Sequence, residues 1–276
     1  MAPIHAYKTT SIASYELWNK RMGHPSSRVV DLIYEVDSVG GNDGVKNKFC
    51  GICFKAQQTK EVFFSNDNKA KECFDLIHCD LWGAYRVLAS CGGIYFLTIV
   101  GDCSRVVWIY LLNRKDEVAC VLKNFIVMVR RQFEKNVKIV KSNNGTEFMC
   151  LTKYFVEHGI LHQTSCVGTA QQNGHVERKH RHILNVARTL RFQAHLPIEF
   201  WGECVLTTGY LINRTPSILL DGKTPYEILY GQASSYKHIR TFGCLCYAHD
   251  QNQHKDKFAS RSRKCIFVGY PFGKKG

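Results

Sequence analysis

Two acidic residues stand where carboxylates could hold divalent metal ions: Asp80, at the end of the predicted strand Phe74–Asp80, and Glu177, near the start of the predicted helix Gly174–Ala194. Phosphoryl transfer by the two-metal route needs several carboxylates on one wall of a cleft, because they hold two ions roughly 3.5–4 Å apart. Mg²⁺ and Mn²⁺ prefer oxygen ligands, and carboxylates also offset their charge. The position that follows a neighbouring predicted strand, where a third carboxylate would converge with the other two, is Asn143.

Each of these residues by itself has an ordinary structural explanation. An aspartate at a strand end usually forms part of a turn or cap, and a glutamate in the first turn of a helix is usually solvated or interacts with the helix dipole. Asparagine offers a neutral amide oxygen, so it does not supply the charge that a bound ion needs. Together, the three positions would converge on the geometry of a two-metal centre, to which Asn143 contributes no charge.

The predicted elements around these residues follow the order three strands, helix, strand, helix, strand and two helices. This order is typical of a ribonuclease-H-like mixed sheet, an α/β fold flanked by helices. Periods of two and 3.6 residues place the elements as follows. The predicted strands are Phe74–Asp80, Gly93–Val100, Val106–Leu112, Val137–Val140 and Ile160–Thr164, and the predicted helices are Lys115–Phe133, Tyr154–His158, Gly174–Ala194 and Pro197–Asn213.

Three regions are predicted along the 276 residues. Residues 1–65 are charged and turn-rich, residues 70–235 contain the catalytic-core pattern, and residues 236–276 return to short strand-like pieces. The last region is expected to be the start of a small C-terminal β module.

The charge balance favours a polyanionic partner. Lys and Arg number 37 against 23 Asp and Glu, which gives a net charge of +14. Nucleic acid or an anionic membrane surface would suit that excess. No apolar run approaches the ~18 residues of a membrane span, so nucleic acid is the favoured partner and no membrane association is expected.

The same sequence favours an intracellular protein, in the nucleus or the cytoplasm. Its first residues contain no apolar stretch of the kind found in secretory signals. Without such a signal, its 13 cysteines are interpreted as reduced thiols rather than as a disulfide framework.

Several stretches together resemble the Pol polyproteins of copia-type LTR retrotransposons, and the resemblance runs through nearly the whole chain. Three of them surround the acidic positions: IHCDLWG at 77–83, SNNGTEF at 142–148 and TAQQNGHVER at 169–178. Further similar pieces are GHPS at 23–26, CGIC at 50–53, FWGE at 200–203, YLINRTP at 210–216, TPYEILYG at 224–231 and RSRKCIFVGYP at 261–271. The resemblance identifies a pre-integrase zinc region followed by an integrase catalytic core.

The resemblance implies DNA integration by two-metal polynucleotidyl transfer, with Mg²⁺ or Mn²⁺ as cofactor, element and target DNA as partners, a homo-oligomer, and no small-molecule substrate. Asp80 and Glu177 match the first and third catalytic carboxylates of the family, and Asn143 matches the second. Because Asn143 replaces an aspartate, this copy is expected to bind the ions weakly and to be catalytically defective.

Two further departures concern the segment before Glu177. The interval from Asn143 to Glu177 is two residues shorter than is usual in the family, which suggests a deletion near Met149–Leu151. A less proline-rich loop, with Val167-Gly168 and Ala170, is expected to be looser. Asp102 and Glu147 are considered as carboxylates that could replace the missing one.

The N-terminal region contains most of a zinc site. Cys50 and Cys53 form a CxxC pair, and the resemblance adds His24 as a third ligand. A structural zinc needs four ligands, but Asn19 stands where the family has the first histidine. An incomplete zinc site is therefore expected, with His5 as a remote fourth ligand; two packed thiols beside a turn are the alternative.

Basic residues on the helix Gly174–Ala194 are interpreted as DNA contacts. Arg178, Lys179, Arg181 and Arg188 lie outside a predicted buried stripe of Val176, His180, Ile183, Ala187 and Leu190. A row of guanidiniums beside a catalytic carboxylate suits phosphate binding. A solvated charged face is the alternative. A second basic cluster, Lys255, Lys257, Arg261, Arg263 and Lys264, is left open between phosphate binding, a nuclear address and a solvated loop.

Two other functions remain open at this point. One is a non-catalytic nucleic-acid-binding module retained by the host, and the other is a ribonuclease of the same fold. The TAQQNGHVER stretch and the zinc-like preface argue against the ribonuclease.

Overall fold

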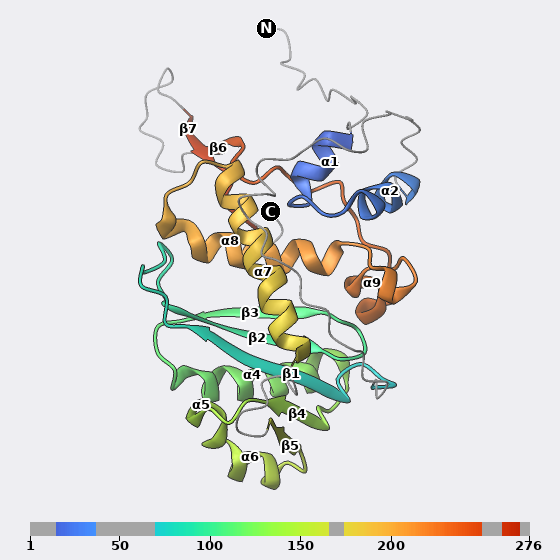
Figure 1. The fold of residues 1–276 in the computed structure, drawn as a ribbon, viewed down its shortest axis with the longest axis vertical. Helices are drawn as coiled ribbons and strands as arrows, with labels where there is room; N and C mark the ends of the chain where they lie inside the picture. The colour runs from blue at the N-terminus through green and yellow to red at the C-terminus, as the bar shows by residue number, and fades with distance from the viewer. Residues whose placement is uncertain (1–14, 37–69, 166–173, 250–260, 271–276) are drawn as a thin grey trace, which may run out of the picture.

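Five strands form the central mixed sheet of the computed structural model, which describes residues 15–36, 70–165, 174–249 and 261–270 (Figure 1). The strands are β1 (Leu76–Gly83), β2 (Tyr95–Gly101), β3 (Val107–Leu112), β4 (Ile139–Ser142) and β5 (Leu161–Thr164). They lie in the order β3-β2-β1-β4-β5, and β2 runs antiparallel to both of its neighbours, β1 and β3. β4 and β5 are parallel additions on the other side of β1, so β1 is central.

Side chains alternate between the two faces of β1, as the period of a strand requires. Ile77 and Cys79 are fully buried in the hydrophobic cluster on one face. Trp82 contacts a second cluster on the opposite face, where α7 crosses the sheet. Asp80 has the same parity as Trp82, so the alternation directs the Asp80 carboxylate toward α7.

One face of the sheet is covered by α4 (Glu117–Phe133), α5 (Thr146–Met149) and α6 (Thr152–Glu157) (Figure 1). The helix α4 matches the predicted Lys115–Phe133 closely, because its buried residues recur at helical spacing. These residues are Val118, Leu122, Phe125 and Val129. Glu134, at φ 53°, adopts the left-handed conformation that ends the helix. The short α5 was not predicted, and the Met149–Leu151 segment lies at its junction with α6.

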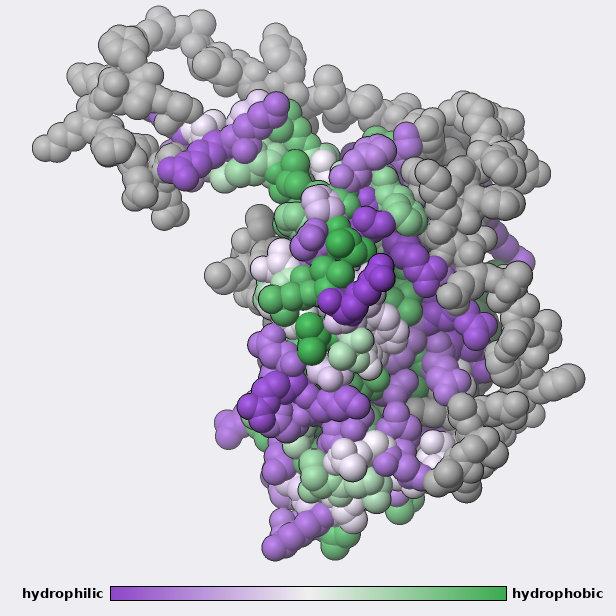
Figure 2. Space-filling model, turned by 60° about the vertical axis from the view of Figure 1, so that its left-hand side comes forward, coloured by the Kyte–Doolittle hydropathy of each residue, from purple (hydrophilic) through white to green (hydrophobic). Residues whose placement is uncertain are grey.

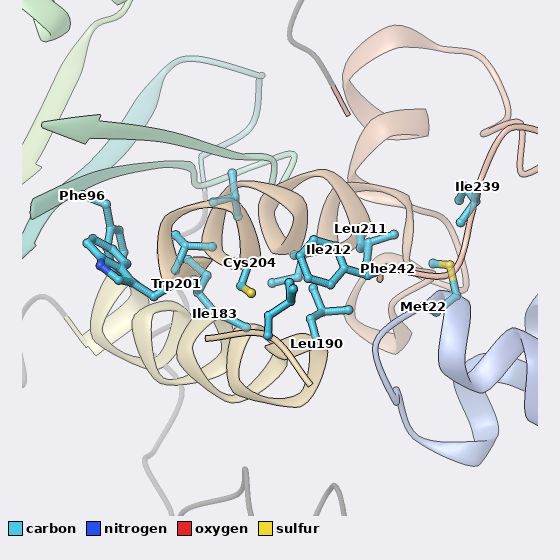
Figure 3. Close-up of a cluster of buried hydrophobic side chains, with 14 of the residues drawn as sticks. Met22, Phe96, Ile183, Leu190, Trp201, Cys204, Leu211, Ile212, Ile239 and Phe242 are labelled. Carbon is cyan, nitrogen blue, oxygen red and sulfur yellow. The ribbon is translucent and has the colours of Figure 1, made fainter. Parts of the chain in front are cut away.

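The opposite face is covered by α7 (Gly174–Gln193) and α8 (Trp201–Arg214), which pack against each other (Figure 1). Figure 3 shows side chains of both helices in one cluster with Phe96 of β2. The predicted helix Pro197–Asn213 begins instead as a short 3-10 turn, Ile198–Phe200, before α8. Gly202 fits close to the sheet, since a Cβ there would lie 3.0 Å from Cδ1 of Leu111 in β3 and 2.9 Å from the Cβ of Ala89 in the β1–β2 connection.

Residues from both ends of the chain join the same cluster. The N-terminal region, expected to be turn-rich, contains α1 (Tyr15–Arg21) and α2 (Ser27–Val36). From these helices, Trp18 is 2% exposed, and its ring meets Tyr236 edge-to-face at 5.8 Å. Met22 lies near Ile239 and Phe242 in Figure 3. Tertiary packing therefore holds both helices against the core, and the apolar residues of α2 also recur at helical spacing.

The remaining elements are α9 (Pro225–Tyr230), the 3-10 turn Ile218–Leu220, and the hairpin of β6 (Leu245–His249) and β7 (Ser262–Ile266). The helix α9 was not predicted, although its start signal is plain in the sequence. Thr224 caps the helix, Pro225 occupies its first position, and Glu227 completes a capping box.

The sheet order, the mixed strand directions and the helices on both faces confirm the predicted ribonuclease-H-like α/β fold. None of the helices in the described ranges is long and apolar enough to cross a membrane.

Candidate functional site

Three elements bring the sequence-predicted catalytic positions together. β1 carries Asp80, and Asn143 directly follows β4, its parallel neighbour. The pairing of His78 with Lys141 continues by two residues to place Asn143 beside Asp80. The helix α7, which carries Glu177, crosses over β1. Asp80 and Asn143 therefore meet at the site although they lie 63 residues apart in the sequence.

The Asp80 carboxylate is held at both oxygens. Its Oδ1 accepts hydrogen bonds from Asn143 Nδ2 at 3.0 Å and from the backbone N–H of Leu81 at 3.0 Å. Its Oδ2 lies 3.3 Å from Nδ1 of His180, one turn beyond Glu177 on α7. The Asn143 amide is also held at both ends, because its Oδ1 accepts from the N–H of Gly145 at 2.9 Å. Asn143 therefore contacts Asp80 through a donor.

Glu177 is exposed at the edge of this group. Partial burial and the negative charge of Asp80 raise its pKa, and the neighbouring His180, Arg181 and Arg178 act in the opposite direction. Glu177 on α7 is thus raised in pKa by the like charge of Asp80 on β1.

The residues present do not fit a pair of divalent ions. Asp80 and Glu177 supply two negative charges, and Asn143 points an N–H rather than an oxygen at Asp80. In the part of the chain that the structure describes, no three His, Cys, Asp or Glu side chains are arranged to hold a metal. Among the described residues, the site therefore supplies only two of the several carboxylates that a two-metal centre needs.

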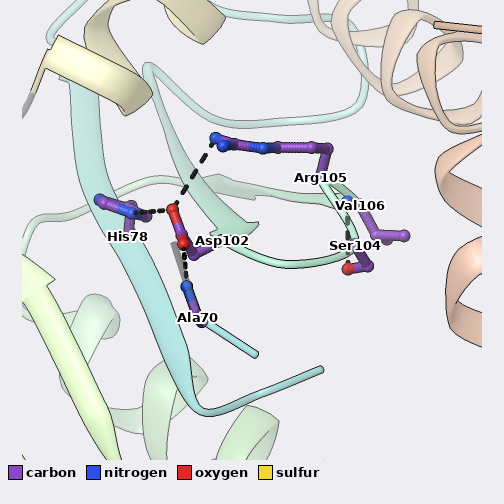
Figure 4. Close-up of polar contacts among 6 residues, drawn as sticks. All are labelled: Ala70, His78, Asp102, Ser104, Arg105 and Val106. Atoms are coloured by element: carbon purple, nitrogen blue, oxygen red, sulfur yellow. Dashed lines mark hydrogen bonds and ion pairs between the residues drawn. The ribbon is translucent and has the colours of Figure 1, made fainter. Parts of the chain in front are cut away.

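Asp102, considered as a replacement carboxylate, belongs to a different polar network (Figure 4). Its side chain is 3% exposed and accepts from His78 Nε2 at 3.1 Å and from the N–H of Ala70 at 2.7 Å, with Arg105 at 3.8 Å. Burial alone would raise the pKa of Asp102, but the bonds from His78 and Ala70 and the charge of Arg105 lower it to about 2. Asp102, which directly follows β2, therefore binds both the segment before β1 and β1 itself.

Glu147, the other replacement considered, lies in the first turn of α5. A Cβ placed on Gly145 would lie 2.6 Å from its carboxylate, so the side chain folds over this glycine. Gly145 in turn donates its N–H to Asn143. Glu147 thus packs beside the backbone that orients Asn143.

The predicted buried stripe of α7 occurs as expected, with Val176, Ile183 and Leu190 fully buried. The four basic residues of this helix differ in their environments. Arg178 is exposed, whereas Lys179 and Arg181 are half-buried near Glu177. Arg188 is also half-buried, and it donates to Asn185 Oδ1 at 3.2 Å while it lines a cavity beside α8. Arg188 is therefore set apart from the other three.

The zinc-like residues are only partly described. His24 Nε2 lies 3.0 Å from Gln193 Oε1 at the end of α7, and burial is the main cause of its lowered pKa. Asn19 donates to the carbonyl oxygen of Pro25 at 3.4 Å. His5, Cys50 and Cys53 lie outside the described residues, as do the Val167-Gly168 and Ala170 loop and the basic residues Lys255 and Lys257. Arg261, Arg263 and Lys264 are exposed along or next to β7.

The sequence reasoning missed His180 as a neighbour of the carboxylates and treated it only as part of the buried stripe. The available signal was its spacing, because a residue three positions after Glu177 lies on the same side of the helix. The contact between Asp102 and His78 was also missed.

The sheet order, with β1 at its centre and α7 crossing it, defines a ribonuclease-H-like domain. Comparison with known families agrees at both ends of the chain. Residues 2–58 match the GAG-pre-integrase domain, and residues 244–276 match the retroviral polymerase SH3-like domain.

Individual relatives extend this agreement over most of the chain. The Retrovirus-related Pol polyprotein from transposon TNT 1-94 of Nicotiana tabacum is 34% identical over 93% of this chain and 20% of its own length. The Pol polyprotein from transposon RE1 of Arabidopsis thaliana is 31% identical over 95% of this chain and 18% of its own length. The predicted resemblance is thereby confirmed: the chain corresponds to the integrase-related segment of copia-type retrotransposon Pol polyproteins, and it spans about one fifth of the length of these relatives.

Among solved structures, the HTLV-2 integrase catalytic core domain in complex with magnesium, in a trimeric form, matches 59% of this chain and 100% of its own. The sequence identity is 15% and the TM-score is 0.44.

Proposed function

We propose that this chain is a DNA-binding integrase domain whose metal-dependent transfer chemistry is defective. The observation that supports the proposal most directly is the 3.0 Å hydrogen bond from Asn143 Nδ2 to Asp80 Oδ1. It occupies the carboxylate oxygen nearest to the position where a second carboxylate would stand. The amide brings a positive hydrogen-bonding edge to a place where cation binding needs negative charge.

DNA binding is proposed to use the N-terminal half of α7. Arg178, Lys179 and Arg181 are adjacent to Glu177, and the net charge of +14 favours a polyanion. Contacts to phosphates fix the position of the duplex and carry no sequence information themselves. Binding is therefore expected to depend on salt more than on base sequence. Assembly of several copies on element and target DNA is part of the proposal.

An end-joining assay tests the catalytic part. The unmodified protein, Asn143→Asp, and Asn143→Asp combined with Glu177→Gln are compared on DNA ends with Mg²⁺ or Mn²⁺. We expect no joining by the unmodified protein and partial joining by Asn143→Asp, because three carboxylates then surround the site. Robust joining by the unmodified protein would contradict the defect, and joining that survives Glu177→Gln would exclude Glu177 from the site.

The same proteins distinguish the alternatives. An RNA–DNA hybrid in place of the DNA ends tests the ribonuclease, since hybrid cleavage by Asn143→Asp without DNA joining would favour that activity. DNA binding by a protein that no substitution activates would favour the non-catalytic binding module.

A further inference from the structure

A cavity of about 330 Å³ lies beside the candidate site, between β1, α7 and α8. Its walls are mainly apolar and come from segments far apart in the sequence. Its lining includes Trp82, Tyr85, Ala187, Arg188, Arg191 and Trp201. A volume near 300 Å³ is at the small end of ligand sites, so the cavity suits one small ring system rather than a large ligand.

Aromatic rings form one side of this cavity. Trp82 follows Asp80 by two residues on the same face of β1, and Tyr85 continues from it into the connection to β2. Their ring centroids lie 5.6 Å apart, and Trp201 at the start of α8 lies 5.5 Å from Tyr85. Trp201 is fixed by a 2.8 Å hydrogen bond from its Nε1 to the carbonyl oxygen of Val87. Trp82 and Tyr85 are only half-buried, so their rings remain accessible at the cavity.

Two guanidiniums, one turn apart on α7, form the other side. Arg191 donates one hydrogen bond to the carbonyl oxygen of Leu196 at 3.2 Å, and its guanidinium lies 4.6 Å from the centre of the Phe192 ring. A guanidinium has five N–H donors, so this one bond leaves Arg191 able to bind an anion as well. No acidic side chain lines the cavity within the described residues. On the face turned forward in Figure 2, hydrophobic side chains (green) near the middle of the view lie directly beside strongly hydrophilic ones (purple).

Planar apolar walls joined to positive charge match the chemistry of one ligand class. Bases stack on Trp and Tyr rings and on guanidinium planes, and the attached phosphate is bound by arginine. An unpaired base fits these walls, whereas a base inside a duplex keeps its faces stacked on its neighbours. The rings of the cavity therefore favour unpaired nucleotides over duplex DNA.

The cavity lies within reach of a DNA strand that is bound beside Glu177. Arg188 lies about three helical turns, or roughly 16 Å, beyond Glu177 along α7. That length corresponds to about five nucleotides at the rise of B-form DNA. Trp82 lies about 7 Å beyond Asp80 along β1. A strand held at the carboxylates can thus reach the cavity within a few nucleotides.

We propose that this cavity binds an unpaired nucleobase, with its phosphate on Arg188 and Arg191, and so gives the protein a preference for DNA ends with unpaired nucleotides. This inference rests on the proposed DNA-binding function and adds a second contact to it. Paired DNA would bind through the basic residues near Glu177 alone.

The test compares three labelled duplexes of equal length by fluorescence anisotropy. One is blunt, one carries a short unpaired tail, and one carries the same tail with abasic sites. We expect the base-bearing tail to bind about tenfold more tightly than the abasic tail, as base stacking on aromatic side chains predicts. A 2-aminopurine in the tail is expected to lose fluorescence on binding, because it stacks against the rings.

Two substitutions should remove this preference. Tyr85→Leu removes a ring, and Ala187→Met fills the cavity without changing a charge. Each is expected to bring the two tailed duplexes to equal affinity while the blunt duplex is bound as before. Tyr154→Leu and Ala119→Met, at half-buried positions on the opposite face of the sheet, are the matched controls and should keep the preference. The same far-ultraviolet circular dichroism for all four variants shows that they are folded.

The outcomes separate this inference from the proposed function. Salt-dependent binding of all three duplexes with equal affinity would overturn the base pocket and leave DNA binding intact. Retention of the preference in both Tyr85→Leu and Ala187→Met would place the unpaired base elsewhere. Failure to bind any of the duplexes would overturn both proposals.

Discussion

At the scale of single residues, the side-chain nitrogen of Asn143 determines which partner the Asp80 carboxylate has. A carboxylate at position 143 would repel Asp80 unless a cation lay between them, whereas the amide of Asn143 donates to Asp80 Oδ1 directly. The amide therefore stabilises the arrangement without a metal. On the proposal of a defective site, this hydrogen bond takes up an Asp80 oxygen that a bound metal ion would need.

The first prediction follows from that exchange. Asn143→Asp is expected to lower the free energy of unfolding by about 1–3 kcal/mol without divalent ions, because it replaces a hydrogen bond by repulsion between carboxylates. Mn²⁺ should reverse most of this loss, since ligand binding to the folded state stabilises it. Thermal unfolding with and without Mn²⁺ measures both effects. Asn144→Asp, at an exposed neighbouring position, is the control and should show neither effect.

The second prediction concerns Asp102 and acid. Its pKa is lowered from 3.8 to about 2, so the carboxylate stabilises the fold above pH 4 and this contribution is lost as the pH falls toward 2. Asp102→Asn should lower the unfolding free energy at neutral pH by about 2 kcal/mol, and the difference should shrink across that window. Urea unfolding at several pH values measures it. Asp116→Asn, which removes an exposed partner of Arg114, should change little.

At the scale of elements, α7 combines two functions on one helix. Its apolar stripe packs on the sheet and on α8, while its N-terminal half presents Glu177 and basic residues beside β1. The buried stripe fixes the rotation of the helix about its axis. The same contacts therefore determine which way Glu177 and His180 face.

The third prediction tests the proposed phosphate contacts of α7. Arg178→Ala combined with Arg181→Ala should weaken DNA binding and reduce the slope of log K against log salt by about two, because roughly one counterion is released for each phosphate contact. Anisotropy titrations at several salt concentrations measure the slope. Arg130→Ala with Arg131→Ala makes the same charge change on α4, across the sheet, and should leave the slope as it was. An unchanged slope in the α7 variant would remove this helix from the DNA surface.

At the scale of the whole molecule, one hydrophobic cluster joins segments from both ends of the described chain. It contains side chains of α1 and α2, the stripe of α7, most of α8, and Tyr236, Ile239 and Phe242. Burial of apolar surface on this scale makes separate unfolding of the N-terminal helices unfavourable. This cluster therefore contains residues from both sides of the predicted region boundaries near residues 65 and 235.

The fourth prediction uses Trp18, which is 2% exposed in that cluster. Trp18→Ala should lower the unfolding free energy of the core by about 3–5 kcal/mol, because it removes a large buried ring and leaves a cavity. Urea unfolding followed by circular dichroism is expected to show one transition moved to lower urea. Tyr247→Ala, at a ring that is 64% exposed, is the control. A core transition at its original midpoint would mean that α1 and α2 unfold independently.

The sequence by itself determined the order of the core elements, the buried stripe of α7 and the identity of the two carboxylates with the amide between them. These features are local: alternation along β1 and the 3.6-residue period of α7 are written in neighbouring residues. The charge deficit at Asn143 is likewise a property of one residue type. The helix α2 was missed although its apolar residues recur at helical spacing, whereas α1 packs against a distant partner, Tyr236.

Only the tertiary structure decided which polar atoms meet. The register of β1 against β4 aligns Asn143 with Asp80, the crossing of α7 brings His180 to the same carboxylate, and the end of β2 commits Asp102 to His78. It also placed Arg188 in a cavity with rings from β1 and α8 instead of beside Glu177. These contacts join residues far apart in the chain. They depend on strand register and helix rotation, which are set when both faces of the sheet are buried at once.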